Sequence, residues 1–594
     1  MNKSRNPLKN LLKDFFPLKE YFIQNRLVLL TGFICLLSVD FLQLIVPLVI
    51  KRAIDSLTIK AATTAALLNY AMIILIIALI TGILRFFWRF LVFGHSRKVE
   101  EKLRNRLFQH LESLSLAFYH RTKTGDIMAR SINDIMAVRM AIGMGLVALV
   151  DSLVIGLAAI CFMIYINPFL TLLSLLPAPF VIFLARKLTR QMSSGHENVQ
   201  KKFSDLTERV REAFAGIRVI KSFSRENWEH ERFREEGRSY ISANIKLAKT
   251  VAFFFPMMGL LTNLGLAIVI WFGGRLTILD HITTGDFVAF IGYLNLLTWP
   301  MMAIGWVTNL FQRGSASMRR INRILDETPE ITSPAISKDV QPPAGGIEFT
   351  GISFAYTGKT EYALKDISMT VKQGQTVSLV GRVGSGKTTL LYTIPRLLEI
   401  QRGSILIDGR DIRRYPLKTL RENIGFVTQD AIIFSDTIRN NVLFGRSDIP
   451  EEELLYALKA AGIHDEIFSL DNGLDTLLGE RGVTLSGGQR QRLTIARAIV
   501  SEPPILILDD SMSMIDTRTE ENILNMVLSH RKDKTNLIVS HRLSTISRAD
   551  LIAVMDRGKI VEMGDHESLM NKGDEFARLY ERQVLAQELE MTEG

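Results

Sequence analysis

A glycine-rich segment carries the first residues whose spacing points to chemistry. Gly381-Arg-Val-Gly-Ser-Gly-Lys387-Thr388 has the spacing G-x-x-x-x-G-K-[ST], between a strand-like apolar run and a helical pattern. Glycines in that context let backbone N–H groups turn toward phosphate oxygens, while the lysine reaches the β- and γ-phosphates and the threonine offers a hydroxyl to Mg²⁺. The segment predicts a site for ATP and Mg²⁺. The residues expected to bind the nucleotide here are Gly381, Gly384, Ser385, Gly386, Lys387, Thr388 and Thr389.

A second segment supplies acidic groups. The apolar run Ile505-Leu-Ile-Leu-Asp509 is typical of a buried parallel strand that ends in a carboxylate. Asp509 is therefore expected to share Mg²⁺ with Thr388. The plain structural alternative is a strand-end aspartate that caps the next turn.

A third segment combines a helix cap with exposed backbone donors. Leu485-Ser486-Gly487-Gly488-Gln489 is followed by Arg490-Gln-Arg. Ser486 can cap the helix, and the free N–H groups of its first turn form an anion site. At this pentapeptide the sequence resembles the ABC transporter family, and the resemblance covers nearly the whole chain.

The family's other motifs follow in order, and the resemblance assigns roles to their residues. It implies that Tyr356 stacks on adenine, that Gln429 joins Thr388 and Asp509 at Mg²⁺, and that Ser486, Gly487, Gly488, Gln489 and Asp516 also contact nucleotide. It implies catalytic roles for Gln429, Asp510 and His541, the last in Val-Ser-His-Arg. Glu480-Arg-Gly482 resembles the exporter-type X-loop, and Ser513-Met-Ile-Asp516 the D-loop.

Hydrophobic patterning shows what positions these motifs. The 594 residues are 47% apolar and 22% charged, and their mean hydropathy is +0.18. A positive mean hydropathy together with this share of charged residues indicates that the chain has two parts of unlike composition. Six apolar stretches of about 20 residues, each long enough to cross a bilayer, precede the motifs. They are Val28–Ile50, Ala65–Phe87, Ile142–Ile166, Phe169–Ala185, Val251–Phe272 and Phe287–Leu310.

Charge and cysteine content narrow the location and the partners. The net charge of +10 comes from basic residues beside the apolar spans, which favours cytoplasmic loops over a nucleic-acid surface. We expect a multi-pass protein of the bacterial cytoplasmic membrane with both termini inside. Leu11 to Phe22 could form an interfacial helix. Cys35 and Cys161 are the only cysteines, which excludes a disulfide framework.

A change of composition divides the chain. We expect an all-α membrane domain over residues 1–326, with six transmembrane helices continuing into the cytoplasm, a Pro/Ser-rich linker over 327–346 and an α/β P-loop ATPase domain over 347–594. Phe118–Asp126 and Ala215–Phe223 resemble the family's two coupling helices, the expected contacts of the cytoplasmic extensions with ATPase domains. Ordinary helix–loop packing is the alternative for both.

One position departs from the family pattern. Asp510 follows Asp509 where most active members have glutamate as the base for the attacking water. Aspartate is shorter by one C–C bond, about 1.5 Å, and a misplacement near 1 Å can cost about 10²-fold in rate. We therefore expect slow hydrolysis at this chain's own P-loop. The intact signature would complete a partner's site, as in one half of bacterial heterodimeric multidrug exporters. A homodimer with a usable Asp510 is the alternative.

The expected function is ATP-driven export of amphipathic drugs or lipids by a heterodimer with a second, different half-transporter. A homodimeric lipid flippase and a nucleotide-gated channel or regulatory subunit remain alternatives. Four charged residues lie in the apolar spans, namely Asp40, Arg85, Arg89 and Asp151. Because a charge inside the membrane is costly, these residues are candidates for a functional role. For the two arginines, the alternative without a functional role is that their long side chains snorkel to the lipid headgroups.

Overall fold

A computed structural model describes residues 13–59, 63–334, 341–479, 485–540 and 542–593. These residues form two compact units, each described by itself. The first, here the helical unit, comprises residues 1–112 and 124–327, and the second, the α/β unit, comprises 113–123 and 328–594.

Among the described residues, the helical unit contains six spans that are long and apolar enough to cross a membrane, which confirms the expected fold class. Each has at least 33 residues, or roughly 50 Å of helix, so each exceeds a hydrocarbon core of about 30 Å. Its elements are η1 (Phe16–Leu18), α2 (Lys19–Gln24), α3 (Arg26–Thr58), α4 (Thr64–Ser113), α6 (Thr124–Ala129), η2 (Arg130–Asp134), α7 (Ile135–Met140), η3 (Ala141–Gly145), α8 (Leu146–Ile166), α9 (Pro168–Ser174), α10 (Ala178–Ala215), α11 (Ile217–Ser222), α12 (Glu226–Ile268), η4 (Val269–Gly273), α13 (Gly274–Ile278) and α14 (Thr284–Leu325).

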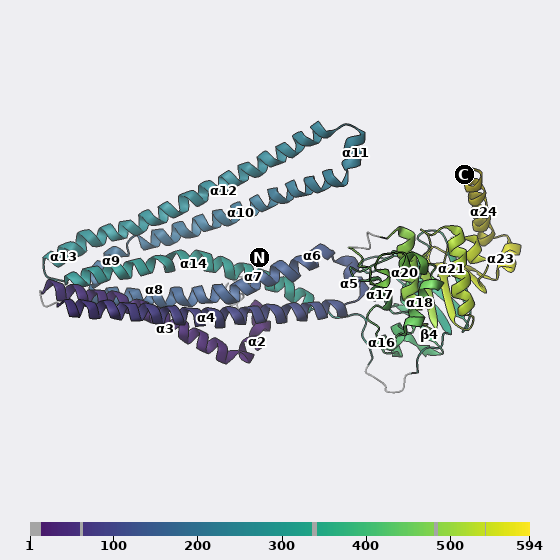
Figure 1. Ribbon diagram of the computed structural model, residues 1–594, viewed down its shortest axis with the longest axis horizontal. Helices are drawn as coiled ribbons and strands as arrows, with labels where there is room; N and C mark the ends of the chain where they lie inside the picture. Colours follow the sequence, from purple (N-terminus) through teal and green to yellow (C-terminus); the bar gives the residue numbers. More distant parts are fainter. Residues whose placement is uncertain (1–12, 60–62, 335–340, 480–484, 541, 594) are drawn as a thin grey trace. The chain divides into compact units, whose positions relative to one another are not determined.

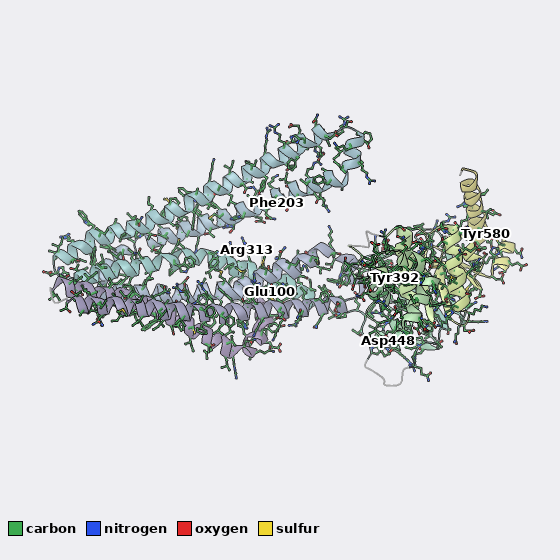
Figure 2. The ribbon with its side chains drawn as sticks, viewed as in Figure 1. Glu100, Phe203, Arg313, Tyr392, Asp448 and Tyr580 are labelled. Atoms are coloured by element: carbon green, nitrogen blue, oxygen red, sulfur yellow. The ribbon has the colours of Figure 1, made fainter. Side chains whose placement is uncertain are left out.

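Helix α14 is the packing centre of this unit and contacts α3, α8 and α10. Tyr293 is fully buried there; its hydroxyl donates to the Leu44 carbonyl of α3 at 3.0 Å and its ring stacks on Phe162 of α8 at 5.2 Å. Because no water reaches a buried hydroxyl, it needs an acceptor within the protein. Glu100 of α4, labelled in Figure 2, also forms an ion pair with Arg139 of α7 at 3.4 Å.

Helices α10 and α12 run side by side and are joined by α11 (Figure 1). The ring of Phe203 on α10, labelled in Figure 2, lies 5.8 Å from the Tyr240 ring of α12. Around α11 the side chains of Phe214, Val219 and Phe223 are 60–72% exposed. The second coupling segment expected from the sequence therefore carries an exposed apolar surface.

The α/β unit is built on two sheets with strand orders β2-β1-β4-β5 and β10-β9-β3-β8-β7-β6. The second sheet is parallel over β9, β3, β8, β7 and β6, and β7 is buried at every position, as expected for a parallel strand covered on both faces. The elements are α5 (Leu116–Arg121), β1 (Ile347–Phe354), β2 (Leu364–Val371), β3 (Thr376–Gly381), α15 (Lys387–Thr393), β4 (Arg402–Ile407), β5 (Arg410–Asp411), η5 (Ile412–Arg414), α16 (Leu417–Glu422), β6 (Ile424–Val427), α17 (Ile438–Leu443), α18 (Glu451–Ala460), α19 (His464–Phe468), η6 (Gly473–Asp475), α20 (Gly487–Ile499), β7 (Ile505–Asp509), α21 (Thr517–His530), β8 (Thr535–Val539), α22 (Leu543–Ile546), β9 (Leu551–Asp556), β10 (Lys559–Gly564), α23 (His566–Lys572) and α24 (Glu575–Glu593).

Candidate nucleotide site

The glycine-rich loop leaves β3 and enters α15 in a conformation that needs its glycines. Gly381, Gly384 and Gly386 have φ of +151°, +81° and +106°, a region that costs other residues energy. A Cβ on Gly381 would meet the Met555 carbonyl oxygen at 2.1 Å. Lys387 donates from Nζ to the Gly381 carbonyl at 2.7 Å. The backbone is thus folded as an anion-binding loop requires.

Thr388 and Asp509 are brought together from separate elements. Thr388 Oγ1, in the first turn of α15, donates to Asp509 Oδ1 at the end of β7 across 3.0 Å. The second oxygen, Oδ2, is buried and has no hydrogen-bond partner among the described residues. Burial raises the pKa of Asp509 to about 6, and the like charge of Asp510 adds to this. A hydroxyl and an unsatisfied carboxylate oxygen are the donors that Mg²⁺ prefers, so the residues fit that ion.

Asp510 stands on a fixed backbone. Its φ is +47°, a conformation that aspartate tolerates better than most residues, and its N–H donates to the Val539 carbonyl at 3.1 Å. Gln429 follows β6, the neighbour of β7 in the sheet, and is exposed. Since carboxyl ends of parallel strands share one edge, Gln429, Asp509 and Asp510 lie on the edge that carries the glycine loop.

Tyr356 connects the glycine loop to a segment far away in sequence. Its hydroxyl hydrogen-bonds Thr389 Oγ1 of α15 at 2.9 Å, and its ring lies 5.0 Å from Phe354. The His120 ring of α5 is 5.9 Å from the Tyr356 ring. Within the α/β unit, the first coupling segment expected from the sequence thus lies against the aromatic residue assigned to adenine.

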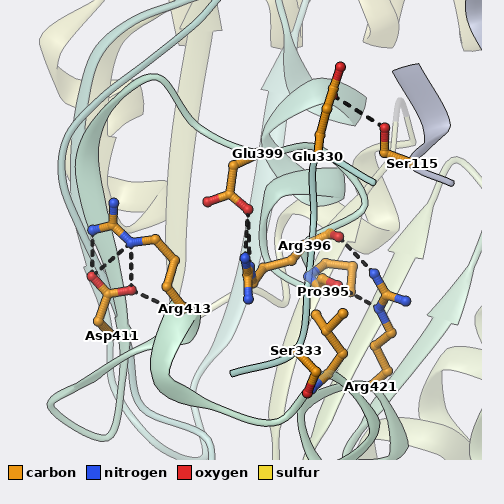
Figure 3. A network of polar contacts seen from close by, with 10 residues as sticks. Ser115, Glu330, Ser333, Pro395, Arg396, Glu399, Asp411, Arg413 and Arg421 are labelled. Atoms are coloured by element: carbon orange, nitrogen blue, oxygen red, sulfur yellow. Dashed lines mark hydrogen bonds and ion pairs between the residues drawn. The ribbon is translucent and has the colours of Figure 1, made fainter. Parts of the chain in front are cut away.

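A small groove of about 150 Å³ separates α5 from the loops beside Tyr356. Ser115, just before α5, donates to Glu330 at 3.2 Å (Figure 3). The loop after α15 is held from below by Arg421, which donates to the carbonyls of Pro395 and Arg396 at 3.0 and 2.8 Å (Figure 3). The bonds from Arg421 fix the loop that faces α5 across the groove.

The signature segment begins α20 with a reciprocal cap. Ser486 Oγ accepts from the Gln489 N–H at 3.2 Å, and Gln489 Oε1 accepts from the Ser486 N–H at 2.8 Å, which is a capping box. A Cβ on Gly487 would meet Met514 Sδ at 2.8 Å, and one on Gly488 the Met514 carbonyl at 3.1 Å. Gly488 therefore lets the helix approach the D-loop backbone closely, whereas a Cβ on Gly487 would only displace the flexible Met514 side chain. No hydrogen bond or ion pair between described residues joins this segment to the glycine loop.

Several residues of this region carry no motif signal that sequence reasoning used. Gln491 is buried; it accepts from the Met514 N–H at 2.9 Å and donates to Ser513 Oγ at 3.2 Å. Glu466 of α19 accepts from Gln489 at 2.7 Å and pairs with Arg492 at 2.6 Å. The available hint was the polar run Gln489-Arg-Gln-Arg492, in which Gln489 and Arg492 bind α19 and Gln491 binds the D-loop segment.

The predicted D-loop aspartate has a structural role. Asp516 caps α21 by accepting from the Thr519 N–H at 2.9 Å, which lowers the pKa of this carboxyl. His541 lies outside the described residues, as does the Glu480-Arg-Gly482 segment. The next residue, Arg542, donates to the Ile515 carbonyl at 2.6 Å and pairs with buried Glu520.

Taken together, the glycine loop, the Thr388–Asp509 pair and the sheet define a P-loop nucleotide-binding domain, joined in one chain to six membrane-spanning helices. The family models agree with both parts. Residues 29–301 match the family model of the ABC transporter transmembrane region, and residues 364–513 match the ABC transporter model.

Relatives of known sequence extend this match over the chain. The chain is 36% identical over 568 residues, 96% of each of the two chains, to a probable multidrug resistance ABC transporter ATP-binding/permease protein of Bacillus subtilis. It is 33% identical over 551 residues, 93% of this chain and 91% of the relative, to an ATP-dependent lipid A-core flippase of Syntrophus aciditrophicus. A bacterial Atm1-family ABC exporter solved with ATP bound superimposes with a TM-score of 0.76 at 27% identity, over 95% of this chain and 98% of that one.

The chain belongs to the ABC transporter family. It is a multi-pass membrane protein that couples ATP hydrolysis to transport, and its relatives are multidrug and lipid exporters.

Proposed function

We propose that the chain is one half of a heterodimeric exporter of amphipathic drugs or lipids in a bacterial cytoplasmic membrane, with both termini inside. Its own nucleotide site binds ATP with Mg²⁺ but hydrolyses it slowly. The observation that carries this proposal is Asp510, placed after Asp509 on a backbone whose N–H is tied to β8.

The geometry of this backbone supports slow hydrolysis. A general base has to approach within about 2.6–3.2 Å of the group whose proton it takes. Because Asp510 is anchored at its N–H and has the shorter side chain, it cannot regain the reach of glutamate without moving β7 or β8. Thr388, Asp509 and Gln429 would hold Mg²⁺, which would neutralise phosphate charge. Lys387 would bind the phosphates, and Tyr356 would orient the adenine ring. His541 would complete the site as a catalytic residue.

The signature supports a second role, at the partner's site. The N-terminus of α20 presents backbone donors beside Ser486, which suits phosphate oxygens. Gln491 ties this helix to Met514 of the D-loop. We propose that the Ser486–Gln489 segment and Asp516 close over nucleotide held by the partner half, which retains a glutamate base.

Two segments would carry the closure to the membrane helices. Helix α5 rests against Tyr356 through His120. The exposed apolar side chains around α11, Phe214, Val219 and Phe223, would dock on the ATPase domain of the second half. Each ATP-driven closure would then pull on helices from both halves.

A homodimeric lipid flippase is the second candidate, favoured by the 33% identity to a protein named as a lipid A-core flippase. It requires Asp510 to act as a sufficient base. The two candidate functions therefore predict different ATPase rates for this chain purified alone.

The test is the ATPase rate of the chain purified alone and together with its partner. We expect the chain alone to hydrolyse ATP slowly, Asp510→Glu to raise the ATPase rate of the complex, and Lys387→Ala to abolish that gain. Asp533→Glu, a matched change at an exposed position of the same domain, should leave the rate unchanged. A wild-type chain that turns over rapidly alone, or an unchanged rate in Asp510→Glu, would contradict the proposal.

A further inference from the structure

A cavity of about 540 Å³ lies inside the helical unit among α3, α4, α8 and α14. That volume is typical of a ligand site. Its wall is largely apolar and includes Trp88, Trp299 and Trp306, three of the five tryptophans in the chain. It also includes formal charges of both signs at membrane depth.

The positive charges belong to Arg85 and Arg89, one turn apart on α4, and both line the cavity. No ion pair between described residues involves either guanidinium. Arg89 lies over the Trp88 ring at 5.6 Å. A guanidinium has five donors arranged in a fork that matches phosphate, and these two lack an anionic partner.

The negative charges come from two other helices. Asp151 of α8 lines the cavity, accepts from Trp299 Nε1 at 3.2 Å and interacts with the carboxyl group of Asp40. Asp40 of α3 is 0% exposed, and neither of its oxygens has a described hydrogen-bond partner. The charged groups that face Asp40 are Asp151 and Arg85.

Unpaired charges inside a membrane domain are costly and mark functional sites. A cationic ligand would satisfy the carboxylates and leave two guanidinium groups unpaired. An anionic ligand would do the reverse. A ligand with both charges satisfies both sets, while the apolar wall takes its chains.

We propose that this cavity binds a zwitterionic phospholipid whose headgroup carries a phosphate and a primary ammonium. The phosphate lies against Arg85 and Arg89. The ammonium lies against Asp151, with Asp40 behind it and tryptophan faces beside it. This inference rests on the proposed export of amphiphiles and names their class.

The test is a lipid titration of the purified complex in detergent, read by native mass spectrometry. Four lipids with identical acyl chains are compared: phosphatidylethanolamine, phosphatidylcholine, phosphatidylglycerol and a trimethylammonium-propane lipid. We expect phosphatidylethanolamine to bind at least about tenfold more tightly than the other three, because they lack the phosphate or the N–H donors; tenfold corresponds to about 1.4 kcal/mol. These comparisons use the unmodified protein and so do not depend on the folding of any variant.

Variants then assign the preference to the cavity. Arg85→Gln with Arg89→Gln should lower phosphatidylethanolamine affinity to that of the cationic lipid. Asp151→Asn, which keeps an acceptor for Trp299, should lower it to that of phosphatidylglycerol. Thr81→Val is the control, because Thr81 is buried on the same helix and does not line the cavity.

Equal affinity for phosphatidylglycerol or for the cationic lipid would overturn the inference, as would variants that keep the full preference. ATP hydrolysis of the same preparations separates this inference from the proposed function. Normal ATPase activity without the lipid preference contradicts the inference alone. A lipid preference in a complex that hydrolyses no ATP contradicts the proposed function alone.

Discussion

Thr388 Oγ1 donates to Asp509 Oδ1 across 3.0 Å, so the first turn of α15 is joined to the end of β7 through the two side chains that suit Mg²⁺. We predict that Asp509→Asn weakens binding of ATP in the presence of Mg²⁺ by tenfold or more, since an amide supplies no charge to the cation. Binding of ATP in excess chelator should change less than threefold. Isothermal titration in both conditions measures this, and equal losses in both would contradict a metal role for Asp509.

Acid should weaken the same interaction. Burial raises the pKa of Asp509 to about 6, so its carboxylate becomes protonated as the pH falls from 7.5 to 5.5. We predict that Mg²⁺-dependent ATP affinity falls through this window in the wild type and not in Asp509→Asn.

Stability without nucleotide should respond in the opposite sense. Because the pKa of Asp509 in the folded state lies above its ordinary value of 3.8, the folded state binds more protons between about pH 4 and 6, and Asp509 contributes stability there that is lost as the pH rises. The midpoint of thermal unfolding of wild type relative to Asp509→Asn should therefore decline from pH 4 to pH 6. A flat difference would show that the carboxyl titrates normally.

The aromatic position at the nucleotide site can be tested by a graded pair. Base–aromatic stacking contributes about 1–3 kcal/mol, so we predict that Tyr356→Ala weakens ATP binding by roughly five- to 150-fold. Tyr356→Phe keeps the ring and loses only the bond to Thr389, and should cost threefold or less. Fluorescent ATP displacement measures both, and equal effects would contradict stacking.

His120 should act on the same ring from α5. We predict that His120→Ala raises the KM for ATP two- to fivefold in the assembled complex with little change in kcat, because it supports the Tyr356 ring and touches no reacting group. Combination with Tyr356→Ala should add nothing further. Additive effects would place His120 outside this coupling.

The ion pair between Arg542 and Glu520 should dominate local stability. Glu520 is buried and is held by Arg542 and by Thr545 Oγ1 at 2.9 Å. Removing one partner of a buried pair costs about 3–5 kcal/mol, so Arg542→Met should lower the unfolding temperature of the ATPase domain markedly. Glu520→Gln added to Arg542→Met should restore part of the loss. Calorimetry of the full chain tests this, and no recovery would mean that Arg542 stabilises mainly through the Ile515 carbonyl.

The sequence was most informative where chemistry depends on local spacing. The glycine loop, the strand that ends at Asp509 and the capping box at Ser486 are each set by a few consecutive residues, and the six apolar spans by bilayer thickness. Gln491, Glu466 and Arg542 were not found, because their partners are distant in sequence and only packing brings them together. The pairing of His120 with Tyr356 needed the fold for the same reason.

The charged residues of the cavity show a second limit of prediction from sequence. Asp40, Arg85, Arg89 and Asp151 stand out in sequence because charges are rare in apolar spans. Their periodicity does not say which of them share a face across three helices. The helix packing around α14 decides this, and it depends on buried residues such as Tyr293.

The most direct test of the central claim is the mass and composition of the native complex that contains this chain, extracted from its own membrane. The account predicts a complex of this 67.0 kDa chain with one different half-transporter, which carries glutamate after the aspartate that ends its corresponding strand. A complex near twice 67.0 kDa that contains only this polypeptide would contradict it, and Asp510 would then have to serve as the base at both sites.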